Sequence, residues 1–158
     1  MIYKWLLWLR NVNVAVFVTV LCTASYVVVV PLAIVESFYP SLQQGTGPSS
    51  LQSSSLLFRI IVGALIFPLV ETVLLQFLPI RLIYKQTKTT AIGAVFTSSV
   101  LFAGVHYYSV GYVVFAFLVG IILAGGFVIR DVSAGRPFLS ILCAHILRNL
   151  VSAFVMTS

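Results

Sequence analysis

The chain has 158 residues, of which 61% are hydrophobic and only 8% are charged, whereas about one quarter of the residues of an average soluble domain are charged. Nine basic and three acidic side chains are too few to cover a soluble surface. We therefore expect one domain over residues 1–158, embedded in a lipid bilayer. Nucleic acid is not an expected partner, because dispersed basic residues in a membrane protein reflect its orientation.

Five stretches of the chain are long and apolar enough to form membrane-spanning helices, which need about 20 residues each. In chain order they are 12–35, 55–78, 91–108, 110–129 and 138–157. Lipid offers backbone groups no hydrogen-bond partner, so these spans must be helical. The sequence thus predicts an all-α polytopic transmembrane helical bundle of about five spans. Residues 36–54, rich in Ser, Gln, Gly and Pro, are predicted to form an extramembrane loop.

The basic residues alternate along the chain in a way that predicts its orientation. Lys4 and Arg10 precede the first span, and the basic residues that follow the second and fourth spans are Arg81, Lys85, Lys88, Arg130 and Arg136. The 36–54 loop has no Lys or Arg. Because basic loops stay in the cytoplasm, we expect a cytoplasmic N-terminus in a multi-pass protein of the cell membrane. The sequence carries no signal for an oligomeric state.

Two further patterns concern helix ends and helix packing. Several tyrosines predicted near the outer ends of spans fit an interfacial aromatic belt: Tyr39, Tyr107, Tyr108 and Tyr112. Gly120 and Ala124 are small residues four positions apart in the fourth span. Small residues at this spacing let helix backbones approach closely, so this face of the span is predicted to pack tightly.

Polar side chains inside the spans are the candidate functional residues, since a charge at the bilayer centre costs roughly 2.5–3.5 kcal/mol on insertion scales. Three spans supply them: Glu71 in the second, His106 at the end of the third, and His145, Arg148 and Asn149 in the fifth. Residues four apart share a helix face, which aligns His145 with Asn149 and Phe102 with His106.

Glu71 and the two histidines have the chemistry for hydrolysis of an amide without a Ser or Cys nucleophile. A carboxylate and an imidazole can take a proton from water and orient it, and a second imidazole with a carboxamide can bind the resulting oxyanion. Glu71, His106 and His145 could instead hold zinc with an open fourth position, although the chain has no HExxH motif. A structural ion pair between Glu71 and Arg148 would leave both histidines unexplained.

The order and spacing of these residues resemble the CPBP family, the CAAX prenyl protease and bacteriocin-processing intramembrane endopeptidases, also called Abi or self-immunity proteins. That family carries the motifs EExxxR, FxxxH and HxxxN or HxxxD on separate transmembrane helices. Glu71 takes the first Glu position, Phe102 to His106 reproduces FxxxH, and His145 to Asn149 reproduces HxxxN. The resemblance covers roughly residues 55–157.

The resemblance implies a role for each matched residue in a glutamate-dependent intramembrane protease. Glu71 with His106 would activate the water, and His145 with Asn149 would bind the oxyanion. No metal is obligatory in such a mechanism, so we expect no cofactor.

The first motif departs from the family pattern at two positions. Thr72 stands at the second Glu and Gln76 at the Arg, so the motif reads ETxxxQ, and the resemblance implies that both residues support the site. Arg148 lies outside the motifs, and we expect it to form an ion pair or an interfacial contact.

The predicted function is therefore an endopeptidase that cleaves a peptide or a membrane-associated protein. The alternatives are a non-catalytic membrane protein for bacteriocin self-immunity or partner scaffolding and, last, a proton-coupled transporter, for which inverted repeats are lacking. Counted at about 1.5 Å per residue, Glu71 and His145 lie about 10 Å inside the cytoplasmic ends of their spans, but His106 lies about 22 Å from Ala91. We expect a cavity open to the cytoplasm.

Overall fold

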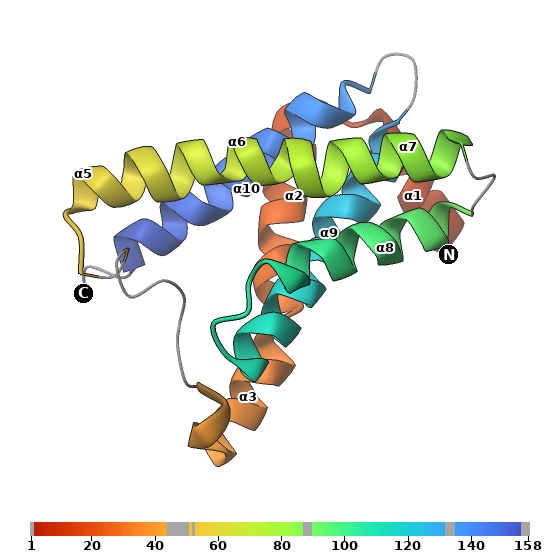
Figure 1. Cartoon of the computed structure of the whole chain (residues 1–158). Coiled ribbons are helices and arrows are strands. Elements are labelled where there is room, and N and C mark those ends of the chain that lie inside the picture. The colour runs from red at the N-terminus through yellow and green to blue at the C-terminus, as the bar shows by residue number, and fades with distance from the viewer. Residues whose placement is uncertain (1, 44–50, 52, 87–89, 132–134, 156–158) are drawn as a thin grey trace.

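The structure is a computed structural model that describes residues 2–43, 51, 53–86, 90–131 and 135–155, and every regular element in these ranges is helical (Figure 1). In chain order the elements are α1 (Ile2–Asn11), α2 (Val14–Val27), α3 (Val30–Phe38), η1 (Pro40–Gln43), α5 (Leu56–Phe58), η2 (Arg59–Ile66), α6 (Phe67–Glu71), η3 (Thr72–Phe77), α7 (Leu78–Gln86), α8 (Ala91–Gly104), α9 (Val110–Arg130) and α10 (Pro137–Val155). The predicted all-α bundle is confirmed.

Four helical stretches of the described chain are long and apolar enough to cross a membrane: Val14–Phe38, Leu56–Ile83, Val110–Arg130 and Pro137–Val155. They correspond to four of the five predicted spans. The remaining one, predicted at 91–108, is wrong in its extent, because α8 has only 14 residues. At about 1.5 Å per residue α8 is about 21 Å long, short of the ~30 Å hydrocarbon core. The predicted 36–54 loop also begins too early, since α3 continues to Phe38.

The early end of α8 has a cause in the side chain of His106. The amide of His106 donates to the carbonyl of Ala103 at 3.0 Å, and its ring Nδ1 lies 2.6 Å from the carbonyl oxygen of Phe102. The side chain thus occupies the carbonyl that the next turn of an α-helix would use. His106 consequently lies in the connection to α9, whose first turn is capped by the Ser109 hydroxyl.

The stretch from α5 to α7 is one continuous helix in Figure 1, but η2 and η3 within it are π-helical. The amide of Phe67 bonds the carbonyl of Val62, five residues back, and the next residue, Pro68, has no amide to bond Gly63. A proline ring also clashes with the carbonyl four residues back, which the wider π turn relieves. The carbonyl of Gly63 is therefore left free for another donor.

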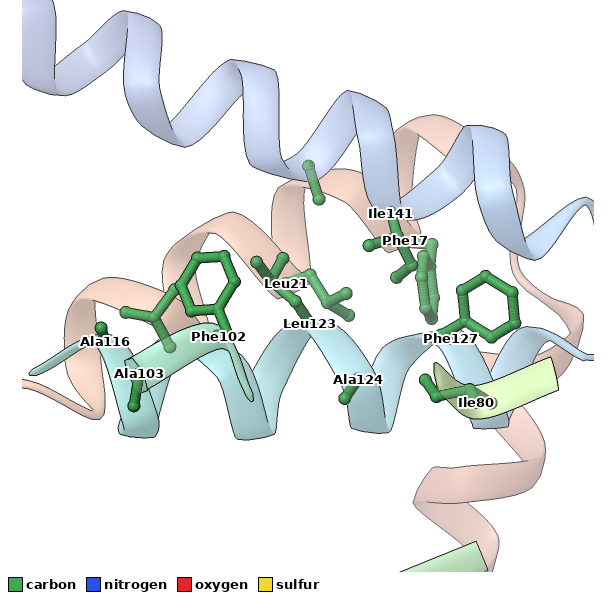
Figure 2. Packing of buried hydrophobic residues seen from close by; sticks show 12 residues of the cluster. Phe17, Leu21, Ile80, Phe102, Ala103, Ala116, Leu123, Ala124, Phe127 and Ile141 are labelled. Carbon is green, nitrogen blue, oxygen red and sulfur yellow. The ribbon is translucent and has the colours of Figure 1, made fainter. Parts of the chain in front are cut away.

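The apolar core is assembled around α9 (Figure 2). Its buried members come from α2, α7, α8, α9 and α10, and include Phe17, Leu21, Ile80, Phe102, Ala116, Leu123, Ala124, Phe127 and Ile141. A Cβ atom built on Gly120 would lie 3.1 Å from the Cα of Ser99 in α8, and Ala124 is fully buried. The close helix approach predicted from this pair is confirmed.

Basic side chains connect α1, α7 and the C-terminal end of α9. Arg130 at the end of α9 donates to the backbone carbonyls of Arg10 and Val12, and Arg81 of α7 forms an ion pair with Asp131 at 2.8 Å. The segments predicted to face the cytoplasm, which lie in α1, in α7 and after α9, therefore meet at one end of the molecule.

Candidate active site

One cavity of about 90 Å³ is lined by polar side chains from three separate parts of the chain. Glu71, His106, His145, Arg148 and Asn149 all border it, together with Phe102 and Tyr112. We call it the polar cavity. One water molecule occupies about 30 Å³ in the liquid, so the cavity has room for several. All four residues proposed for catalysis thus border one cavity that can hold water.

Glu71 lies between the two histidines, at the point where α6 ends and η3 begins. One carboxylate oxygen is 3.6 Å from Nε2 of His106 and the other is 3.4 Å from Nε2 of His145. Both distances exceed the 2.7–3.2 Å usual for an N–H···O bond. Neither imidazole therefore forms a hydrogen bond of usual length with the carboxylate. A water molecule can bind beside the carboxylate.

The backbone of α8 fixes the proton position on a neutral His106. Its Nδ1 lies 2.6 Å from the carbonyl oxygen of Phe102, and a carbonyl can only accept a hydrogen bond, so Nδ1 carries the proton. The Nε2 atom that faces Glu71 then presents a lone pair. A carboxylate oxygen and an imidazole lone pair, both acceptors, converge on the same point and together suit a donor such as water.

His145 is held from its other side by Thr72. The Thr72 hydroxyl lies 3.3 Å from Nδ1 of His145, and both side chains are buried, with exposed fractions of 0% and 2%. A hydroxyl that donates to Nδ1 leaves the proton of a neutral ring on Nε2, which faces the cavity. Phe102 packs against both imidazoles, with ring centroids 4.5 Å from His106 and 5.7 Å from His145.

The carboxamide of Asn149 supplies a hydrogen bond that the backbone of η2 lacks. Its Nδ2 donates to the carbonyl oxygen of Gly63 at 3.0 Å, the same carbonyl that Pro68 leaves without a partner. The amide nitrogen carries two protons, so one remains to donate elsewhere. Asn149 thereby fixes α10 against the helix that contains Glu71.

Arg148 does not form the expected ion pair. None of the ion pairs of the described residues joins it to Glu71, and only 7% of its surface is exposed. Its guanidinium lies instead over the rings of Tyr26 and Phe115, with centroids at 5.2 and 4.8 Å. Arg148 is therefore buried among aromatic side chains of α2 and α9.

The geometry gives less support to Gln76 as a site residue and to the zinc alternative. Gln76 is fully buried, and neither its Oε1 nor its Nε2 has a hydrogen-bond partner among the described atoms. No contact joins it to the polar cavity, which its side chain does not line. Within the described ranges, no group of three or more His, Cys, Asp or Glu residues has an arrangement that could hold a metal ion.

The sequence did not assign Tyr112 or Tyr26 to the site. Tyr112, predicted as part of an outer aromatic belt, stacks on His106 with centroids 5.8 Å apart and lines the polar cavity. Tyr26 donates from its hydroxyl to the carbonyl of Arg148 at 2.7 Å. Neither residue belongs to a motif, and aromatic residues are common at span ends, so only the fold distinguishes these two.

A comparison with protein families matches residues 53–151 to the type II CAAX prenyl endopeptidase Rce1-like family. The chain belongs to this family. The match confirms the resemblance to CPBP proteases predicted from the three motifs, and it makes the chain an integral membrane endopeptidase of the CAAX type. The segment of Rce1-like sequence contains all five polar residues that line the cavity. No curated protein and no solved structure matches the chain.

Proposed function

We propose that the polar cavity hydrolyses a peptide bond near the C-terminus of a CAAX-type substrate protein in the cell membrane, with Glu71 as the base. The observation that supports this most is the pair of acceptors, Glu71 Oε1 and the lone pair of His106 Nε2, 3.6 Å apart at the cavity wall. A water molecule that donates one hydrogen to each is oriented with its own lone pair toward the cavity. Two acceptors on one water raise the nucleophilicity of its oxygen.

In the proposed reaction Glu71 removes a proton from this water as the oxygen bonds to the scissile carbonyl carbon. Negative charge moves to the carbonyl oxygen, where Nε2–H of His145 and the free amide proton of Asn149 stabilise it. The intermediate collapses by breaking the C–N bond, and the proton on Glu71 passes to the departing amine. The products are a carboxylic acid and an amine, and Glu71 is regenerated.

The test is hydrolysis of an internally quenched, S-farnesylated CAAX peptide by the purified protein in liposomes. We expect Glu71→Gln and His106→Ala to lower kcat/KM by about 10² to 10⁴, the usual contribution of a general base. Glu36→Gln is the matched control, because Glu36 lies on α3 and does not line the polar cavity; its activity should stay within about threefold of wild type. Full activity in Glu71→Gln would refute the proposal.

A further inference from the structure

Arg148 is a buried cation that no acidic side chain of the chain neutralises. The sequence has three acidic residues, and the structure describes all of them. Glu71 faces the two histidines and Asp131 pairs with Arg81, while Glu36 lies against the start of α9. Within the described residues, Nε of Arg148 has no hydrogen-bond partner. Burial of a lone cation costs several kcal/mol, and such a residue within a membrane is a candidate binding site.

The aromatic rings beside Arg148 do not use its hydrogen-bond donors. Tyr26 and Phe115 contact the guanidinium through ring faces at 5.2 and 4.8 Å, and such contacts stabilise a cation. The N–H groups of a guanidinium point outward in its own plane, where a carboxylate binds with two parallel hydrogen bonds. The rings therefore hold the cation in place without using its N–H donors.

Arg148 and His145, three residues apart on α10, pack against different helices. His145 packs on Thr72 and Phe102, from η3 and α8, whereas Arg148 packs on Tyr26 and Phe115, from α2 and α9. Both side chains border the same space. A ligand in the cavity therefore meets the proposed oxyanion site with one part and an unpaired cation with another.

We infer that Arg148 binds the C-terminal carboxylate of the substrate peptide and so restricts cleavage to bonds near the end of a chain. This inference rests on the proposed function and adds to it the part of the substrate that the site recognises. A CAAX sequence is C-terminal, so hydrolysis within it always releases a short peptide that bears a free carboxylate. A buried guanidinium selects that group over an internal peptide bond, which has no charge to offer.

The test compares two peptide probes that differ only in their C-terminal group. One is a ten-residue S-farnesyl peptide ending in Cys-Val-Ile-Met with a free carboxylate, and the other is its C-terminal amide. We expect wild-type kcat/KM to favour the acid by about 10- to 100-fold, the range for a hydrogen bond to a charged group. Arg148→Gln should reduce the acid to the level of the amide and leave the amide within about threefold. Arg148→Lys keeps the charge but cannot form two parallel hydrogen bonds to a carboxylate, so it should retain part of the preference for the acid.

The inference is overturned if wild type cleaves acid and amide equally well. It is also overturned if Arg148→Gln loses activity equally on both, which indicates a packing role. Binding of fluorescein-labelled acid and amide to the Glu71→Gln variant separates this inference from the proposed function. If neither probe is cleaved but acid binds more tightly and Arg148→Gln removes that difference, the proposed function fails and the carboxylate site stands. If activity depends on phosphatidylglycerol through Arg148 and not on the C-terminal group, the cation binds a lipid headgroup instead and the inference fails.

Discussion

The hydroxyl of Thr72 lies 3.3 Å from Nδ1 of His145, on the side of the ring opposite Glu71. A residue that bonds the far nitrogen of an imidazole sets both the orientation and the tautomer of the ring. Thr72 stands where the family motif has its second glutamate, and its neutral hydroxyl makes this contact in a fully buried position.

Replacement of Thr72 by valine should lower kcat by about 10- to 100-fold, as expected when a partner that orients a catalytic ligand is lost. The side chains have nearly the same shape, so the main change is loss of the hydroxyl. Thr72→Ser retains the hydroxyl and is the control, with kcat expected within about threefold of wild type. Equal kcat in Thr72→Val and wild type, measured with the quenched peptide, would show that this hydrogen bond is not needed.

The contact between Asn149 and the carbonyl of Gly63 predicts a coupling between two distant substitutions. Asn149→Ala leaves that buried carbonyl without a donor, which should destabilise the fold by about 1–3 kcal/mol. Pro68→Ala supplies an amide that can bond Gly63 from within the helix, so in the Pro68→Ala background the further loss from Asn149→Ala should be smaller. Thermal unfolding of the four proteins in detergent measures the coupling. Strictly additive effects would contradict this account of the carbonyl.

Gly120 sets the distance between α8 and α9. Its Cβ position is 3.1 Å from a backbone atom of Ser99, which cannot rotate away, so Gly120→Leu should destabilise the fold by about 1–3 kcal/mol or more. Activity should fall as well, since α8 holds His106 through Phe102. The control is Gly125→Leu, because nothing lies within 4 Å of a Cβ there. Similar melting temperatures for the two variants would contradict the close contact.

At Gln76 we expect a substitution that raises the stability of the protein. Its amide is buried and has no hydrogen-bond partner in the part of the chain that the structure describes, and an unpaired buried polar group costs about 1–3 kcal/mol. Gln76→Met has a similar volume and no amide, so its melting temperature should rise while kcat/KM stays within about threefold. Gln76→Glu, which would bury a carboxyl group, should lower the melting temperature. A large fall in activity in Gln76→Met at unchanged stability would instead give Gln76 a part in the site.

The site residues were predictable because the membrane makes them stand out. Polar groups are costly in lipid, so Glu71, His106, His145 and Asn149 are conspicuous in an apolar sequence, and their spacing matched known motifs. Hydropathy also located four spans, since length and composition are what a bilayer requires. The position of His106 was not predictable, because its own side chain ends α8 and no periodicity records that contact.

The partners of Arg148 could likewise not be predicted from the sequence. Tyr26 lies 122 residues away from it along the chain, and a rule based on charge expects an acidic partner rather than two aromatic rings. The free carbonyl of Gly63 was hidden for a related reason. A proline in an apolar stretch predicts a disturbed helix, but only the packing of α10 shows which side chain repairs it.

The shortness of α8 has a consequence for the lipid around it. Irregular backbone does not persist against hydrocarbon, because its amides and carbonyls need hydrogen bonds, and the residues between α8 and α9 are irregular. A bilayer facing a 21 Å apolar helix adapts by thinning, at a modest cost per ångström of mismatch. We therefore expect a thinner bilayer beside His106, which would bring water closer to the proposed site of hydrolysis.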